Sequence, residues 1–292
     1  MRPGELPGLR RQTVANRKIP GVRDAIAGGF DFFNRTYRGW DVPHKFSHEY
    51  AEMEAACLET ASLFWASKEM SELAIAATPS LPGFDLTPDV IPCTAGLIWF
   101  DSALVTRTGA HHYCAASWHP IATENGDGIV ANFYVTAEKV HIVNPGTPDS
   151  MGPLFNEFDQ IALFGPLEFK DDESRRTSPF GALVSAWLLM GQAGIAESTS
   201  REFKLSKGER REGRHDAATV RIVDVARHMK APTGEHDHAD VKYRNRWVVS
   251  GHWRNQWYPK TKTHKPKWIT PYVKGPEGAP LLTQKETVHA WR

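Results

Sequence analysis

Residues 246–258 read Arg-Trp-Val-Val-Ser-Gly-His-Trp-Arg-Asn-Gln-Trp-Tyr and crowd three tryptophans, two arginines and a histidine into one short stretch. Apolar and donor-bearing side chains alternate here, which is the period of a β-strand with two different faces. One parity holds Trp247, Val249, Trp253 and Trp257. The other holds Arg246, Ser250, His252, Arg254 and Gln256. We expect a strand whose tryptophans are structural and whose polar face binds a partner.

Segment 267–274 is expected to be the hairpin partner of this strand. It would add Trp268 to the structural tryptophans and extend the donor-rich face. Arginine offers bidentate donors to phosphate or carboxylate groups. A bulge at Gly251 would instead move His252 to the other face. The residues expected to bind are Arg244, Arg246, His252, Arg254, Gln256, Tyr272 and Lys274.

The net charge of +1 hides an asymmetry along the chain. Residues 201–292 contain 20 Lys and Arg against 10 Asp and Glu, or +10, so the remaining 15 and 24 leave −9 on the first 200 residues. A basic third favours an anionic partner, although the two parts of the chain could instead attract each other. A basic run within this third would contact phosphates or form a solvated linker. The run consists of Arg201, Lys204, Lys207, Arg210, Arg211 and Arg214.

Composition indicates an ordinary globular protein. The 292 residues are 41% apolar and 24% charged, which is enough for a sizeable core. Cys57, Cys93 and Cys114 fit neither a disulfide framework nor a zinc-ribbon spacing. The N-terminus lacks an apolar signal core, and no window approaches the roughly 18 consecutive apolar residues of a membrane span. We expect a cytoplasmic protein with no membrane segment.

The periodicity along the chain predicts an α+β protein. Apolar residues at helical spacing predict one long helix over 47–77, which begins at Ser47 as N-cap. A second, buried helix is expected at 180–192. Strands are expected at 96–100, 112–119, 129–135 and 219–228.

We expect N-terminal helices, a central antiparallel sheet and a C-terminal β-rich basic module packed against it. The corresponding regions are an arm at 1–45 with helical pieces around 21–36, a helical and sheet region at 46–200, and the module at 201–292. Its first part, 201–216, is expected to be a flexible linker. One integrated domain is the alternative to this division.

Familiar catalytic signatures are missing from the sequence. It has no Walker loop, G-x-G-x-x-G, G-x-S-x-G or H-E-x-x-H, so we expect no cofactor. The set His236, His238 and Asp240 would suit zinc or manganese. It lies in a Pro/Gly loop where such residues are ordinarily solvated, so we expect no metal there.

Two histidines on expected strands, His112 and His119, have opposite parity and do not form an obvious pair. We expect them to be core or edge residues. Cys114 lies close to both in sequence. A Cys–His nucleophile is the alternative, and it would need a base within hydrogen-bonding reach of the thiol.

The C-terminal motifs resemble those of a family found on phages and plasmids, which includes type V-A anti-CRISPR proteins of the AcrVA type. The similar motifs are Arg246-Trp247, Gly251-His252-Trp253-Arg254, Trp257, Trp268-Ile269 and Pro271. Proteins of actinobacteria and their phages resemble nearly the whole stretch, including Tyr272-x-Lys274-Gly275-Pro276. A second similarity is Ile91-Pro92 followed by Gly96-Leu-Ile-Trp-Phe-Asp101. Where the family has Arg-Arg before Gly-His-Trp, this chain has Val249-Ser250, and Arg244 and Arg246 would substitute.

The resemblance implies a mobile-element protein that restrains a host or competitor function. The anti-CRISPR relative acts during synthesis of its target, recognising the emerging polypeptide and causing loss of the message. We therefore expect a non-enzymatic recognition protein that binds RNA or a ribosome-associated chain. Two alternatives are a ribonuclease or toxin that uses His252 and Arg254, and an antitoxin-like module that binds one protein.

Overall fold

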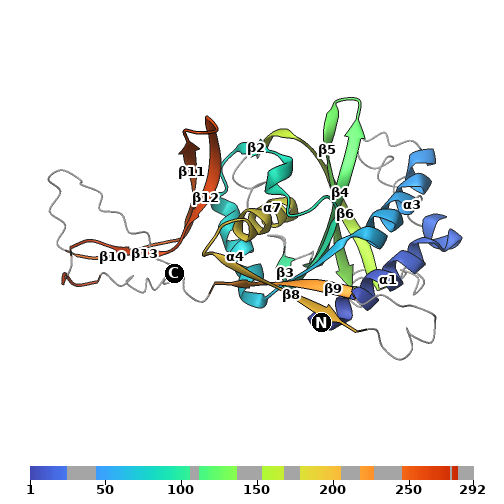
Figure 1. Ribbon diagram of the computed structural model, residues 1–292, viewed down its shortest axis with the longest axis horizontal. Coiled ribbons are helices and arrows are strands. Elements are labelled where there is room, and N and C mark those ends of the chain that lie inside the picture. Colours follow the sequence, from blue (N-terminus) through green and yellow to red (C-terminus); the bar gives the residue numbers. More distant parts are fainter. Residues whose placement is uncertain are drawn as a thin grey trace, which may run out of the picture.

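A seven-stranded β-sheet forms the centre of the molecule (Figure 1). The structure, a computed structural model, describes residues 1–24, 44–105, 112–136, 153–167, 178–204, 218–226, 245–276 and 278–281. The strands lie in the order β6-β5-β4-β3-β1-β9-β8. They are β1 (Ser62–Ala66), β3 (Gly96–Val105), β4 (His112–Thr123), β5 (Gly126–Thr136), β6 (Leu154–Leu163), β8 (Ala196–Phe203) and β9 (Ala218–Val225).

The pairing within the sheet is mixed. Strands β3 to β6 form an antiparallel meander, and β8 is antiparallel to β9. Strand β1 runs parallel to both of its neighbours, β3 and β9. The α+β class with a largely antiparallel central sheet is confirmed, and β1 adds two parallel pairings to it.

Helices cover both faces of the sheet (Figure 1). On one face lie α1 (Leu6–Arg17) and α3 (His44–Thr60), and on the other α4 (Lys68–Ala77) and α7 (Pro179–Met190). Successive side chains of β1 point to opposite faces of the sheet, so the strand packs against both helix layers. Phe64 belongs to the larger core cluster with α4 and α7, and Leu63 belongs to the smaller cluster with α1. Among the described residues, no helix is both long enough and apolar enough to cross a membrane.

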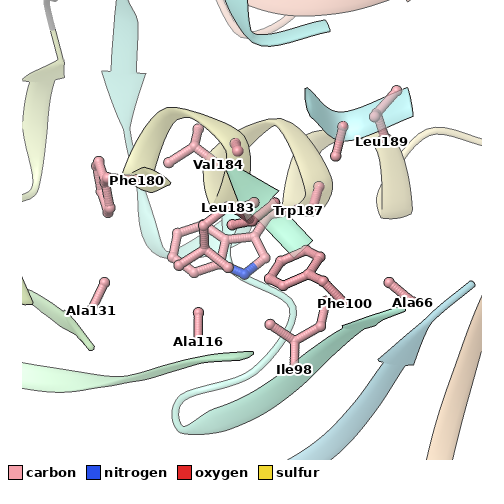
Figure 2. Close-up of a cluster of buried hydrophobic side chains, with 14 of the residues drawn as sticks. Ala66, Ile98, Phe100, Ala116, Ala131, Phe180, Leu183, Val184, Trp187 and Leu189 are labelled. Carbon is pink, nitrogen blue, oxygen red and sulfur yellow. The ribbon is translucent and has the colours of Figure 1, made fainter. Parts of the chain in front are cut away.

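The larger core cluster is built around α7, whose apolar sequence predicts a buried helix. Figure 2 shows Leu183 and Trp187 of α7 above Ile98 and Phe100 of β3. The ring centroid of Trp187 lies 5.2 Å from that of Trp118, in an edge-on arrangement that aromatic rings favour. These contacts fix α7 against the sheet.

The single helix expected over 47–77 is wrong. Helix α3 ends at Thr60, strand β1 follows, and Ser67 then caps α4 by accepting a hydrogen bond from the Met70 amide at 3.2 Å. Residues 63–66 are apolar at every position, which suits a strand that packs against a core cluster on each face of the sheet. Such a short apolar run looks the same in a helix and in a buried parallel strand.

Two further boundaries differ from expectation. The first helix, α1, occupies Leu6–Arg17, ahead of the region around 21–36 where helical pieces were expected; of that region the structure describes only 21–24. The expected linker at 201–216 begins inside strand β8, which continues to Phe203. Residues 205–217 lie outside the described part of the chain.

The C-terminal residues form two separate ribbons rather than one long hairpin. Strand β10 (Trp247–Val249) pairs with β13 (Tyr272–Lys274), and β11 (His252–Tyr258) pairs with β12 (Thr263–Ile269). The break falls at Gly251, where a Cβ atom would lie 2.5 Å from Trp268 Cζ2, so the tryptophan ring requires a glycine. Figure 1 shows β10–β13 extending away from the body, while β11–β12 stands beside β2 (Phe84–Leu86), which pairs with β7 (Gly165–Leu167).

Candidate functional site

The β11–β12 hairpin is anchored by its tryptophan face. Trp253 and Trp268 are directly opposite each other in register and pack edge-on, with ring centroids 5.3 Å apart. Both are buried in the cluster that contains α7. The Gln192 side chain donates to the Trp268 carbonyl and accepts from the Trp268 amide, both at 2.8 Å. This double hydrogen bond fixes the hairpin to the end of α7.

The opposite face of the hairpin is cationic. Arg254 and Lys267 are opposite each other in register, and both are exposed. The next pair on this face is Gln256 and Lys265, and the Gln256 side chain accepts a hydrogen bond from Arg254. The face therefore presents arginine and lysine donors to solvent, supported from below by tryptophans.

Charge in this region is strongly one-sided. Residues 245–276 contain seven lysines and arginines and no aspartate or glutamate. In the part of the chain that the structure describes, the ion pair made by this segment is that of Lys265 with Asp89, at 2.6 Å. The hydrogen bond from Lys265 lowers the pKa of Asp89 below its usual value, with a second bond from Thr87. The remaining cations have no carboxylate of the described chain to neutralise them.

The histidine of this region, His252, is half-buried at the start of β11. Its Nδ1 lies 3.0 Å from the Ser250 carbonyl oxygen, which can only accept, so Nδ1 carries the proton. His252 shares the parity of Arg254, as the alternation predicted. The Nε2 atom is thereby the one left for an external partner.

The expected binding residues do not form one continuous face. Arg246 is committed to the chain itself, since its Nε donates to the Ala279 carbonyl and its amide to the Pro280 carbonyl, both at 2.8 Å. Lys274 and Tyr272 are paired with Trp247 and Val249, so they share the face of those residues on the outer ribbon. The structure brings together His252, Arg254 and Gln256 alone from the expected set.

The structural tryptophans also divide into two groups. Trp253 and Trp268 are buried as expected, and Trp247 is half-buried. Trp257, which was also expected to be structural, is 44% exposed near the tip of the hairpin. Its ring lies 4.8 Å from that of His264, the residue opposite it. Next to it, Tyr258 is 39% exposed.

Several expected site residues fall outside the described part of the chain. Lys204 is exposed directly after β8. Among the residues that the structure describes, no group of three or more His, Cys, Asp or Glu could hold a metal ion. The residues that lie outside are Arg244, the basic-run members Lys207, Arg210, Arg211 and Arg214, and the weak metal candidates His236, His238 and Asp240.

Cys114 is not placed to be a nucleophile. Its thiol is buried in the smaller core cluster and donates to the Tyr134 carbonyl at 3.4 Å. His119, on the same strand, is 1% exposed, as expected of a core histidine. A buried thiol held in this way is closed to substrate.

A buried polar network joins α1, α3 and the sheet, and the sequence patterns did not predict it. Arg17 Nε donates to Glu54 Oε2 at 2.8 Å, and the Tyr134 hydroxyl donates to Glu54 Oε1 at 2.6 Å. Burial acts to lower the pKa of Arg17, but the charge and hydrogen bond of Glu54 outweigh it and raise that pKa. Burial, followed by the charge of Glu54, raises the pKa of Tyr134 well above its ordinary value. Arg17 and Tyr134 therefore stay protonated and paired.

The network continues along β4 and β5. Ser117 Oγ lies 2.8 Å from the Tyr134 hydroxyl, and the Asn132 side chain donates to Ser117 at 3.2 Å. The Tyr50 hydroxyl donates to Asn132. The groups of this network satisfy one another in the closed interior, so we interpret it as a structural element that joins α1 and α3 to the sheet.

The chain resembles known proteins at the level of solved structures. No family model matches the chain, and no curated protein matches it. Among solved structures, the chain is similar to the crystal structure of AcrVA2, with 14% sequence identity and a TM-score of 0.40 over 92% of this chain and 93% of that chain. Values this low establish neither a shared activity nor a shared partner.

Proposed function

We propose that this protein is a recognition protein of the anti-CRISPR kind that binds RNA through the cationic face of the β11–β12 hairpin. The observation that carries the proposal is the charge of 245–276, where seven cations meet no carboxylate of their own segment. A surface of this kind attracts a polyanion by releasing the counterions of its phosphates.

The arrangement of Arg254 and Lys267 supports an anionic partner. Like charges that are directly opposite on neighbouring strands destabilise the pair. Neither side chain has a carboxylate partner among the described residues, so repulsion between them stays uncompensated in the free protein. A phosphate bridging the two side chains would relieve it, and arginine can bind a phosphate with two donors at once.

The exposed aromatic rings at the tip favour RNA over a purely acidic peptide. Trp257 and Tyr258 are both exposed at the tip end of β11. By strand alternation Tyr258 shares the cationic face of Arg254, and Trp257 lies on the other face of the hairpin. Single-stranded nucleic acids are held by cations along the backbone and by bases stacked on aromatic rings. The hairpin combines both features.

The proposed biological role rests on the resemblance of C-terminal sequence motifs of this chain to those of a known family. The Gly251-His252-Trp253-Arg254 motif and Trp268-Ile269 resemble those of phage and plasmid proteins that include AcrVA-type anti-CRISPRs. We propose that RNA binding, directly or beside a ribosome-associated chain, suppresses a host or competitor function. This role would make the protein a product of a phage or mobile element.

RNA binding is tested by fluorescence anisotropy with a labelled single-stranded RNA over a series of salt concentrations. The dissociation constant should rise with salt, and the double variant Arg254→Ala/Lys267→Ala should weaken binding several-fold. Its slope of log affinity against log salt should be shallower by roughly 0.7 for each phosphate that the variant no longer neutralises. The matched control is Lys18→Ala/Lys68→Ala, which removes two exposed lysines that form ion pairs elsewhere, one at the end of α1 and one in α4. No binding, or binding unaffected by salt, would contradict the proposal.

The alternatives predict different results in parallel experiments. Crosslinking in cells should recover RNA with the protein, whereas a single stoichiometric protein without RNA would indicate an antitoxin-like module. Cleavage of the labelled RNA that disappears in His252→Ala, while binding is retained, would indicate a ribonuclease.

A further inference from the structure

An open hollow lies where the tip of the β11–β12 hairpin meets the β2–β7 ribbon. Its volume is about 350 Å³, at the lower end of the roughly 300–1,000 Å³ usual for small-molecule sites. Trp257 lies next to the hollow rather than in its lining, since its ring packs 4.8 Å from that of the lining residue His264. The hollow is lined by Gly83, Phe84, Asp85, Pro166, Lys262, Thr263 and His264.

Lys262 and His264 line the hollow from the hairpin side, where the backbone also has an unusual conformation. Lys262 has a φ of 53°, and it is the only non-glycine residue in the left-handed region among those described. This conformation is unfavourable for a lysine and is held by the turn, in which the Thr261 and Thr263 hydroxyls lie 2.8 Å apart. Strain of this kind gathers at functional sites.

The other side of the hollow carries a single carboxylate, Asp85. It is exposed, and it has no hydrogen bond or ion pair among the described residues. The hollow therefore offers an acceptor-only carboxylate and two potential phosphate donors within one small space. The exposed ring of Trp257 stands beside it, against His264.

We propose that this hollow takes one guanine base of a single-stranded RNA, an inference that rests on the proposed RNA-binding function. A carboxylate has only acceptor atoms. Guanine is the base whose Watson–Crick edge presents two adjacent donors, N1–H and the N2 amino group, and these match both oxygens of Asp85. Adenine and cytosine present one amino group beside an acceptor that repels a carboxylate, and uracil presents one N–H between two carbonyls.

The remaining groups complete the site. The base stacks on the exposed ring of Trp257, because aromatic side chains hold unstacked bases in this way. Lys262 and His264 hold the phosphate of the same nucleotide. The cationic face with Arg254 and Lys267 then binds the neighbouring phosphates without regard to sequence, so the hollow supplies the base preference that this face lacks.

The test uses uridine heptamers that carry guanine, adenine, cytosine or inosine at the central position, with all-uridine RNA as reference. Binding to the full-length protein is measured by fluorescence anisotropy. Guanine should bind about tenfold tighter than uridine, within the roughly 5- to 150-fold discrimination of one bidentate contact. Inosine, which lacks the N2 amino group, should lose part of this gain. In Asp85→Asn the guanine heptamer should fall to the affinity of the others.

A control variant and the pattern of affinities distinguish the guanine site from RNA binding in general. Asp224→Asn, an exposed carboxylate on β9 outside the hollow, should leave every affinity unchanged. Equal affinities for all central bases, or a guanine preference that survives Asp85→Asn, would overturn the guanine site while RNA binding stands. Failure of every heptamer to bind would overturn both. The thermal midpoint of Asp85→Asn should equal that of the wild type, which shows that its fold is intact.

Discussion

Two ion pairs that link α1 to α3 differ sharply in what they contribute. Arg17 and Glu54 are each 1% exposed, while Lys18 and Glu59 are more than half exposed. Removing one partner of a buried pair leaves the other charge without water or a counter-charge. An exposed pair is already well solvated.

Glu54→Gln should therefore lower the free energy of unfolding by about 3–5 kcal/mol. Glu59→Gln, the matched exposed change on the same helix, should lower it by less than about 1 kcal/mol. Urea unfolding followed by circular dichroism measures both. Similar small losses in the two variants would show that the Arg17–Glu54 pair is not desolvated.

His119 predicts a pH dependence of stability. Burial lowers its pKa below the ordinary value of 6.5, and its Nε2 has no hydrogen-bond partner among the described residues. Below pH ~6.5 the unfolded chain binds a proton that the folded chain rejects, so stability is complete above that pH and falls as the pH drops through the folded-state pKa.

The variant His119→Gln carries no charge at any pH, so its stability lacks the pH dependence that His119 contributes. Urea unfolding at several values between pH 7 and pH 5 should show the wild type losing stability relative to the variant, by at most about 1.4 kcal/mol per pH unit. A difference that stays constant over this range would mean that His119 titrates normally in the folded protein.

At this scale the sequence predicted the residues of the hairpin better than those of the interior. Strand parity placed His252 with Arg254 and buried Trp253, because alternation is a local property. The partners Arg17 and Glu54 are 37 residues apart, and their meeting depends on how α1 crosses α3. Likewise, Asp85 and Lys262 meet at the hollow only through tertiary contact between β2 and the hairpin tip.

At the scale of elements, a single side chain makes two of the hydrogen bonds that attach the β11–β12 hairpin to the body. Gln192 satisfies both the amide and the carbonyl of Trp268, which is buried. Gln192→Leu would leave both backbone groups unpaired, at about 1–3 kcal/mol for each. Hydrogen exchange should then show faster opening of β11 and β12 with unchanged protection in β4 and β5. Gln12→Leu, an exposed glutamine in α1, should change neither.

The packing of β3 against β4 makes a second prediction. A Cβ atom on Gly96 would lie 2.2 Å from Trp118 Cζ2, whereas one on Gly8 in α1 would meet nothing closer than 3.9 Å. Gly96→Ala should destabilise by about 1–3 kcal/mol through overpacking. Gly8→Ala should stabilise by about 0.5–1 kcal/mol through helix propensity. Thermal unfolding distinguishes the two, and equal effects would mean that the Trp118 ring can move aside.

Element types were predictable where local signals were strong. Helix α7 and strands β3, β4, β5 and β9 follow from their apolar patterns and turns. Strand β1 was mistaken for helix because its burial on both faces removes alternation. The division of the Trp-rich stretch into β10 and β11 depends on the Trp268 ring over Gly251, a contact from the opposite strand.

At the scale of the whole molecule, the described part of the acidic region makes one ion pair with the cationic hairpin, that of Asp89 with Lys265, which is exposed. Salt should therefore affect RNA binding and folding differently. Between 50 and 500 mM salt, the free energy of unfolding should change by less than about 1 kcal/mol, while RNA affinity falls by orders of magnitude. A parallel loss of both would show that salt acts on the fold itself.

The position of β1 sets an order of events during synthesis. Its sequence is complete at Ala66, and β3 supplies one neighbour soon afterwards, but its other neighbour, β9, begins only at Ala218. At about 5–20 residues per second, the ribosome takes on the order of ten seconds or more to supply it. Until β9 emerges, the apolar strand β1, which lies in the middle of the finished sheet, forms an open edge of the nascent sheet. Completion of the fold is therefore a late event that needs most of the chain to have left the ribosome, and until then the unpaired strand edge is open to pairing with another chain.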